Sequence, residues 1–106
     1  MATKKEFSHM IVHIVLFSFK EDNKITNIQK AKEMLAALEH SVPSLKSIEV
    51  GENFCSEGRA MDLSIITRFD TKEDLQEYAV HPEHLKVVEF IKQAAEYSKV
   101  VDYETL

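Results

Sequence analysis

Residues 10–20 read MIVHIVLFSFK, an apolar run that is interrupted by His13. β-branched and aromatic side chains occupy both faces of this run, which is typical of a strand that is covered on both sides. Alternation along a strand predicts one face with His13, Val15, Phe17 and Phe19 and an opposite face with Val12, Ile14 and Leu16. We therefore expect a central strand here.

The segments that follow this strand alternate between helical and extended patterns. Their periodicity and turn signals predict a helix over residues 23–40, strands over 45–54 and 60–69, a short helix over 71–78, a longer helix over 82–97 and a last strand over 99–103. The order strand, helix, strand, strand, helix, strand predicts an α+β fold of the ferredoxin-like βαββαβ type. Such a fold has an antiparallel four-stranded sheet with its helices on one face.

The two faces of this predicted sheet differ in what can cover them. Strand parity places His13, Phe17, Leu63, Ile65 and Val100 under the helices, and Val12, Ile14, Asp62 and Ser64 on the opposite face. The chain has 106 residues and no spare element for that opposite face, although the first strand is apolar there. An uncovered apolar surface of this kind marks an interaction site, and a second copy can cover it through a two-fold axis. We therefore predict a homodimer that packs sheet face on sheet face.

The composition is that of one small domain with neither a basic stripe nor a membrane-spanning run. A chain of 106 residues with 44% hydrophobic residues can build a single modest core, so we expect one domain over residues 9–106 after a flexible leader over 1–8. The net charge of −5 argues against a nucleic-acid partner, and no apolar run is long enough to cross a membrane. The single cysteine, Cys55, has no internal disulfide partner, which favours a reducing, cytoplasmic location.

Residues 78–84 read YAVHPEH and place a phenol and two imidazoles around a helix start. Proline suits only the first turn of a helix and pushes the residue before it out of the helical region, so His81 should close one helix and Pro82 should open the next. His84 then lies in the first turn, where the positive end of the helix dipole favours a neutral imidazole that can accept a proton. Histidines at such a position also serve as caps or surface residues, and both interpretations stay open.

Five short motifs occur along the chain: HIVLFSFK at 13–20, GEN at 51–53, FD at 69–70, YAVHPEH at 78–84 and VVDY at 100–103. In this order and spacing they resemble the Dabb family, the stress-responsive dimeric α/β-barrel proteins, nearly from end to end. The resemblance implies that two ferredoxin-like subunits form a dimeric barrel. It does not imply one reaction, because one fold hosts many functions and most members have no assigned reaction.

One plant branch of the family consists of polyketide cyclases of the olivetolic acid cyclase type, which close a linear poly-β-ketone by an intramolecular aldol step without a cofactor. The resemblance implies that His84 is the general base and that the Tyr78 hydroxyl holds the reacting carbonyl. His13 and Asp102 match positions on the pocket side, where Asp102 could orient an imidazole, and His81 is a further supporting residue. The chain departs from the cyclases at residues 34–38 and 94–95, where Met34, Leu35 and Leu38 replace an aromatic cluster and two alanines follow, so the ligand shape does not carry over.

Three other interpretations compete with a cyclase-like or lyase-like activity. The His-Pro-x-His turn can be structural, in a non-enzymatic stress or assembly protein whose firm property is dimerisation. Cofactor-free and haem-type monooxygenases share the dimeric barrel, but nothing in this chain singles out a haem ligand. His81, Glu83 and His84 could meet at a divalent metal ion, although Pro82 interrupts the helix between the two histidines. We expect a small-molecule ligand and neither a metal nor another cofactor.

Overall fold

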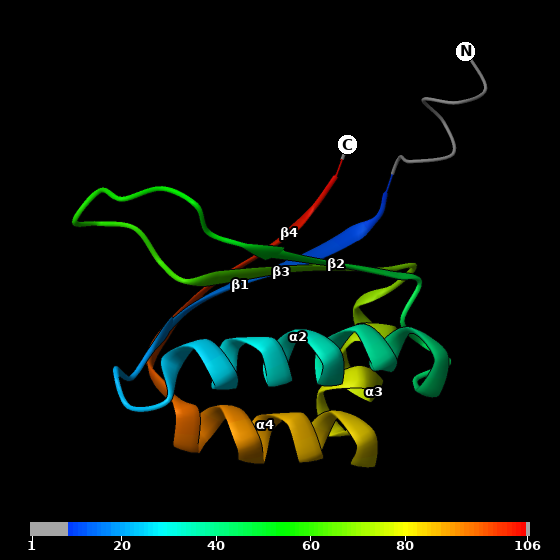
Figure 1. Ribbon diagram of the computed structural model, residues 1–106. Helices are drawn as coiled ribbons and strands as arrows, with labels where there is room; N and C mark the ends of the chain where they lie inside the picture. Colours follow the sequence, from blue (N-terminus) through cyan, green and yellow to red (C-terminus); the bar gives the residue numbers. More distant parts are fainter. Residues whose placement is uncertain (1–8, 106) are drawn as a thin grey trace.

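A computed structural model describes residues 9–105, so the expected leader over residues 1–8 lies outside the described residues. The elements in chain order are β1 Ile11–Phe19, α2 Lys24–Ser41, β2 Ser47–Glu52, β3 Leu63–Phe69, α3 Lys72–Val80, α4 Pro82–Ala94 and β4 Ala95–Glu104. The strands form one antiparallel sheet in the order β2-β3-β1-β4. The helices lie together on one side of this sheet (Figure 1). The predicted ferredoxin-like α+β fold is therefore confirmed, with β1 inside the sheet and β2 at its edge.

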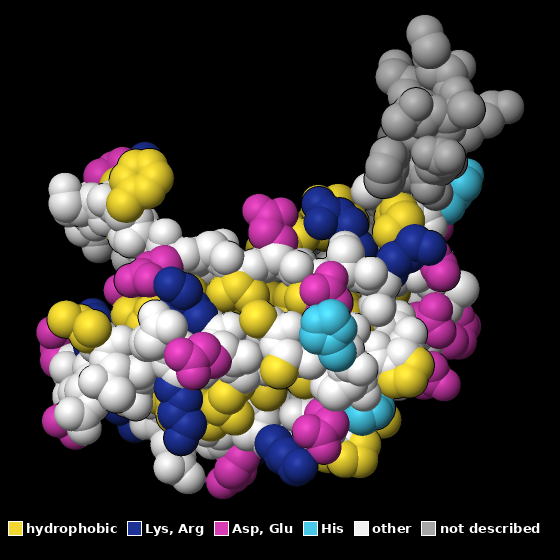
Figure 2. Space-filling view, turned by 45° about the vertical axis from the view of Figure 1, so that its right-hand side comes forward, with side chains coloured by type: hydrophobic (Ala, Val, Ile, Leu, Met, Phe, Trp, Pro, Cys, Tyr) yellow, Lys and Arg dark blue, Asp and Glu magenta, His cyan; other side chains and the backbone are white. Residues whose placement is uncertain are grey.

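The core lies between the sheet and the helices. The inward faces of β1 and β3 bury their large side chains against α2, and these include Phe17, Phe19, Leu63, Ile65 and Phe69 from the strands and Ile28, Ala31, Leu35 and Leu38 from α2. The α2 residues recur every three or four positions, which places them on one helix face. In the space-filling view, hydrophobic side chains gather between the sheet layer and the helix layer (Figure 2). Among the described residues, none of the helices is long and apolar enough to cross a membrane.

Strand β4 is where the sequence prediction needs correction. The last helix was expected to reach Tyr97, but α4 ends at Ala94 and β4 begins at once with Ala95. Val100 pairs with Val15 and so points to the helix side as predicted, yet it is 63% exposed. Every residue of β4 after Ala95 is exposed, because β4 is the edge strand beyond the helix layer.

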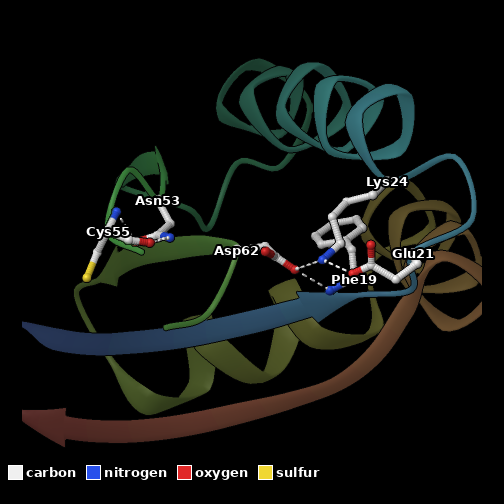
Figure 3. Close-up of polar contacts among 6 residues, drawn as sticks. All are labelled: Phe19, Glu21, Lys24, Asn53, Cys55 and Asp62. Atoms are coloured by element: carbon white, nitrogen blue, oxygen red, sulfur yellow. Dashed lines mark hydrogen bonds and ion pairs between the residues drawn. The ribbon is translucent and has the colours of Figure 1, made fainter. Parts of the chain in front are cut away.

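The opposite sheet face, which we call the open face, carries Val12, Ile14 and Leu16 of β1, Ile66 of β3, and Val101 and Tyr103 of β4. No helix of residues 9–105 covers it (Figure 1), although Val12 itself is 1% exposed. The prediction that Asp62 belongs to this face is wrong. The Asp62 carboxylate accepts a hydrogen bond from the Phe19 amide at 2.7 Å and pairs with Lys24 Nζ at 3.5 Å, so it turns toward the start of α2 (Figure 3).

Residues 53–62 connect β2 to β3, and we call this loop the β2–β3 arm. It rises from the sheet on the side opposite the helices (Figure 1) and forms a separate lobe in the space-filling view (Figure 2). The arm therefore projects from the same side of the molecule as the open face.

Candidate functional site

The break between α3 and α4 positions the two strongest candidate residues. Helix α3 begins at a Thr71 cap, whose side chain accepts a hydrogen bond from the Asp74 amide at 3.0 Å, and it ends at Val80. His81 has an extended backbone with φ −64 and ψ 136, and Pro82 opens α4 as predicted. The chain turns sharply at this point and brings Tyr78, near the end of α3, against His84, in the first turn of α4. Their ring centroids are 4.2 Å apart and their planes are inclined by 37°.

Both rings line a cavity of about 360 Å³ between the sheet and α4. A third polar ring, that of His13 on β1, lies beside them, with its centroid 6.4 Å from that of Tyr78. The apolar part of the wall comes from Val15, Leu35, Ile65, Val87, Val88 and Ile91. The exposed residues Lys92, Glu96 and Ser98 also line the cavity, so it opens to solvent beside the start of β4. The arrangement is an apolar pocket with three polar rings grouped in its wall, which is the usual make-up of a small-molecule site.

His84 is held in the form of a neutral base. Its Nδ1 lies 3.1 Å from the Ala79 carbonyl oxygen, and only a protonated Nδ1 can donate to a carbonyl, so we assign the neutral tautomer with Nε2 as the free acceptor. Burial lowers the pKa of His84, and the nearby His13 and His81 lower it further, while the hydrogen bond to Ala79 opposes the shift. Burial is thus a larger cause of this shift than the neighbouring charges, and the imidazole is neutral at pH 7.

Tyr78 is held in the form of a proton donor. Its side chain is 3% exposed, and burial raises the pKa of its hydroxyl to about 12. The ring packs on Phe69, with centroids 5.2 Å apart, and this contact fixes its orientation under α3. The phenol therefore stays protonated at neutral pH and can donate to an oxygen of a molecule in the cavity.

His13 and Asp102 form a side-chain pair across the β1–β4 ladder. The two residues are directly opposite in the register, and His13 Nδ1 is hydrogen-bonded to Asp102 Oδ1. Asp102 is half exposed and does not line the cavity, so it reaches the site only through His13. A carboxylate accepts the Nδ1 proton of the imidazole and leaves Nε2 of His13 for a bound molecule.

The structure separates His81 from this group. Its Nδ1 accepts a hydrogen bond from the Glu83 amide at 3.1 Å and thereby caps α4. It lines a different hollow of about 460 Å³, together with Pro43, Glu77 and Pro82 among others. Within residues 9–105 there is no group of three or more His, Cys, Asp or Glu side chains that could hold a metal ion.

The helical spacing of Leu85, Val88, Ile91 and Ala95 predicts an inward stripe, and all of these except Leu85 line the cavity, whereas Val87 lies outside that stripe. Val87 lines the cavity as well, and of the three residues that replace an aromatic cluster only Leu35 does so. Residues 96–98 also line the cavity, because α4 ends at Ala94 and these residues belong to β4. The sequence pattern extends the helix to Tyr97 and so does not predict that they line it. Val15 carried a usable signal, since it lies on the same strand face as His13.

Comparison with known proteins agrees with this fold. The family model of the stress responsive A/B barrel domain, Dabb, matches residues 11–105. The chain belongs to the Dabb family. A curated relative, a stress-response A/B barrel domain-containing protein of Arabidopsis thaliana, is 34% identical over 88 residues, which are 83% of this chain. The alignment takes in 34% of the Arabidopsis protein, so this Dabb chain spans about a third of the length of that relative.

Two solved structures extend the comparison. A dimeric protein of unknown function with a ferredoxin-like fold, from Bacteroides fragilis, is 31% identical with a TM-score of 0.83, over 92% of this chain and 98% of that one. The hydroxynitrile lyase of Passiflora edulis is 17% identical with a TM-score of 0.82, over 92% of this chain and 94% of that one. At this low identity the lyase shows a shared fold and no more.

Proposed function

We propose that this Dabb chain is a homodimeric protein that binds a small organic carbonyl compound in the cavity of each subunit and moves a proton on it without a cofactor. The observation that carries the proposal is the close contact of Tyr78 and His84 in the wall of one cavity, with the Nδ1 proton of His84 engaged by a backbone carbonyl. A donor and a neutral base within reach of one bound molecule are the minimum for acid–base catalysis.

The proposed reaction begins at a carbon next to a carbonyl. His84 Nε2 removes a proton from this carbon, the C–H electron pair moves into the carbonyl, and the enolate oxygen that forms is stabilised by a hydrogen bond from the Tyr78 hydroxyl. In a cyclase-like course the enolate carbon attacks a second carbonyl of the same molecule, and the His84 imidazolium returns its proton to the new alkoxide. His13, oriented by Asp102, offers its Nε2 as an acceptor for a hydroxyl or enol group of the same molecule.

The cavity favours a compact substrate with an apolar body. A volume of about 360 Å³ is near the small end of ligand pockets, which span roughly 300–1,000 Å³. Apart from its three polar rings, the aromatic residues of its lining are Phe17 and the rim residue Tyr97, and the rest of its apolar wall is aliphatic. We therefore favour short β-dicarbonyl or hydroxy-carbonyl compounds with an alkyl portion.

Two comparisons support the proposal without assigning a reaction. The Bacteroides fragilis relative is described as dimeric, and the uncovered open face of this chain offers a matching surface for a second copy. The Passiflora edulis relative is a lyase, which indicates that this fold can host an enzyme. The olivetolic acid cyclase type remains the model for the roles given to Tyr78 and His84.

A proton-exchange assay tests the proposal before any natural substrate is known. The purified dimer is incubated in D₂O with small 1,3-diketones, and NMR measures the rate at which deuterium enters the carbon between the carbonyls. His84→Ala should lower the catalysed rate by about 10²-fold or more, and Tyr78→Phe should lower it by about 10²-fold. Leu85→Ala is the matched control, because Leu85 lies in the same turn of α4 but does not line the cavity.

The structural interpretation of the His-Pro-x-His turn predicts the opposite pattern. His84→Ala would then lower the free energy of unfolding by about 1–3 kcal/mol, through loss of a half-buried hydrogen-bonded ring, while exchange and ligand binding would stay as in the wild type. That result would leave a non-enzymatic stress or assembly protein as the better description.

A further inference from the structure

Phe54 stands out because it is a large aromatic side chain that the folded chain leaves fully exposed to solvent. It lies in the β2–β3 arm, and in the space-filling view hydrophobic atoms are prominent on that projecting lobe (Figure 2). An aromatic ring buries more apolar surface on binding than most side chains, so it is a strong anchor when a partner covers it. Nothing within residues 9–105 covers it.

The arm is ordered at its base by hydrogen bonds. Asn53 Oδ1 accepts from the Cys55 amide at 3.0 Å and Asn53 Nδ2 donates to the Cys55 carbonyl at 2.7 Å, so the turn that carries Phe54 is fixed on both sides (Figure 3). The Asn53 amide also donates to the Asp62 carbonyl, which closes the arm at the point where Asp62 is tied to β1. An anchor that is already held in place loses little conformational entropy on binding.

The direction of the arm indicates what it meets. It rises from the sheet on the side opposite the helices, which is the side of the open face (Figure 1). Two sheets that pack face to face lie about 10 Å apart. A loop that rises from the end of one sheet toward the other sheet must then lie against the second subunit.

We propose that the β2–β3 arm clasps a second copy of this chain, and that Phe54 packs on the open face of the partner. The two-fold axis gives each dimer two such contacts. A hollow of about 430 Å³ lies between the arm and the open face, with the apolar Leu16, Ala60 and Met61 in its wall beside charged residues such as Glu57 and Arg59, so this side of each copy has a partly apolar depression as well as an apolar projection. The inference rests on the proposed homodimer and adds the part of the chain that secures it.

A tryptophan placed in the arm gives a direct test. The chain contains no tryptophan, so Phe54→Trp introduces a single fluorophore at the proposed contact. Its emission should be blue-shifted and protected from acrylamide at concentrations where sedimentation shows the dimer, and should become that of a water-exposed indole on dilution to monomer. Ile25→Trp is the matched control, because Ile25 is an exposed apolar residue on α2, in the helix layer, and should stay exposed at all concentrations.

A second variant measures what the contact contributes. Phe54→Ser should weaken dimerisation by about 30-fold or more in Kd, while the circular dichroism of the monomer stays unchanged because the ring is exposed in the free subunit. If the wild type is a dimer and both Phe54 variants behave as though residue 54 were in water, the arm inference is overturned and the dimer stands. If the wild type is a monomer at all concentrations, the homodimer fails and the arm inference fails with it. A blue shift that persists in the monomer would place the ring within its own subunit and would also overturn the inference.

Discussion

Replacing Asp102 with Asn tests the proposed site through a residue that lies outside the cavity. The side chains of Asp102 and His13 are 50% and 21% exposed, and exposed ion pairs typically contribute about 0.2–1 kcal/mol to stability. Asp102→Asn should therefore lower the melting temperature by at most about 4–8 °C, which corresponds to about 1 kcal/mol in a domain of this size. The fold should survive the change, and this makes an effect on the chemistry interpretable.

The expected chemical effect is larger than the effect on stability. Asn presents either an oxygen or an NH₂ group to His13, so it no longer fixes the proton on Nδ1. A hydrogen bond that a substrate hydroxyl or enol group donates to Nε2 of a correctly oriented His13 is worth about 0.5–1.5 kcal/mol, and its loss should slow deuterium exchange by up to about tenfold. Nitrogen-15 NMR of the His13 ring should show a mixture of tautomers in the variant and a single tautomer in the wild type.

A matched carboxylate provides the control. Asp70 pairs with Lys46 at 3.3 Å, with both side chains more than half exposed, and neither residue lines the cavity. Asp70→Asn should change the melting temperature as little as Asp102→Asn and leave the exchange rate unaltered. If both variants catalyse deuterium exchange at the wild-type rate, and if the His13 tautomer in both variants is that of the wild type, then Asp102 has no part in positioning His13 for chemistry.

Three further outcomes follow from the described contacts. Burial lowers the pKa of His84 in the folded chain, so the unfolded chain takes up a proton on this imidazole at a higher pH than the folded chain does. The stability of the wild type relative to His84→Gln should therefore be greatest above about pH 6.5 and fall at lower pH. Urea titrations at several pH values measure this difference, and a constant difference would contradict the prediction. Asp62→Ala should lower the free energy of unfolding by about 1.5–3 kcal/mol, since the Phe19 amide loses a charged acceptor, and a loss below about 0.5 kcal/mol would show that water replaces this contact. Leu16→Lys should yield monomers or insoluble protein in sedimentation runs, because burying a leucine contributes about 2 kcal/mol per subunit, and an intact dimer would exclude the open face as the interface.

The fold was predictable because its strongest signals are local. The two-faced apolar pattern of residues 10–20 requires cover on both sides, and Pro82 can only open a helix, so β1 and the α3–α4 break follow from the sequence. The end of α4 was not predictable in this way, since Ala95 and Glu96 are good helix formers. Pairing of Ala95 with Phe19 in the sheet outweighs that preference, and such pairing is a tertiary property.

The candidate site likewise has residues that local sequence patterns place and residues that only the tertiary structure places. Strand parity is enough to place His13 on the helix side, and the motif is enough to place Tyr78 and His84 around one helix start. The link from Asp102 to His13 depends on the register between β1 and β4, two strands 89 residues apart at this contact, and no local pattern fixes that register. The position of His81 was not predictable from the sequence either, because spacing alone does not say whether an imidazole turns toward the backbone or into a cavity.

The two histidines of the turn make different hydrogen bonds to the backbone. His81 uses its Nδ1 to cap α4, so folding alone explains why an acceptor stands before Pro82. His84 also bonds the backbone, but through Nδ1 to Ala79, and its Nε2 has no hydrogen-bond partner among residues 9–105. Within the described residues, Ser44 Oγ is the buried side-chain atom that has no hydrogen-bond partner, so Nε2 of His84 is not buried away from solvent and faces the cavity. The hydrogen bond to Ala79 engages the first nitrogen of His84, and the second nitrogen is left able to accept a proton from a molecule in the cavity, as the proposed base requires.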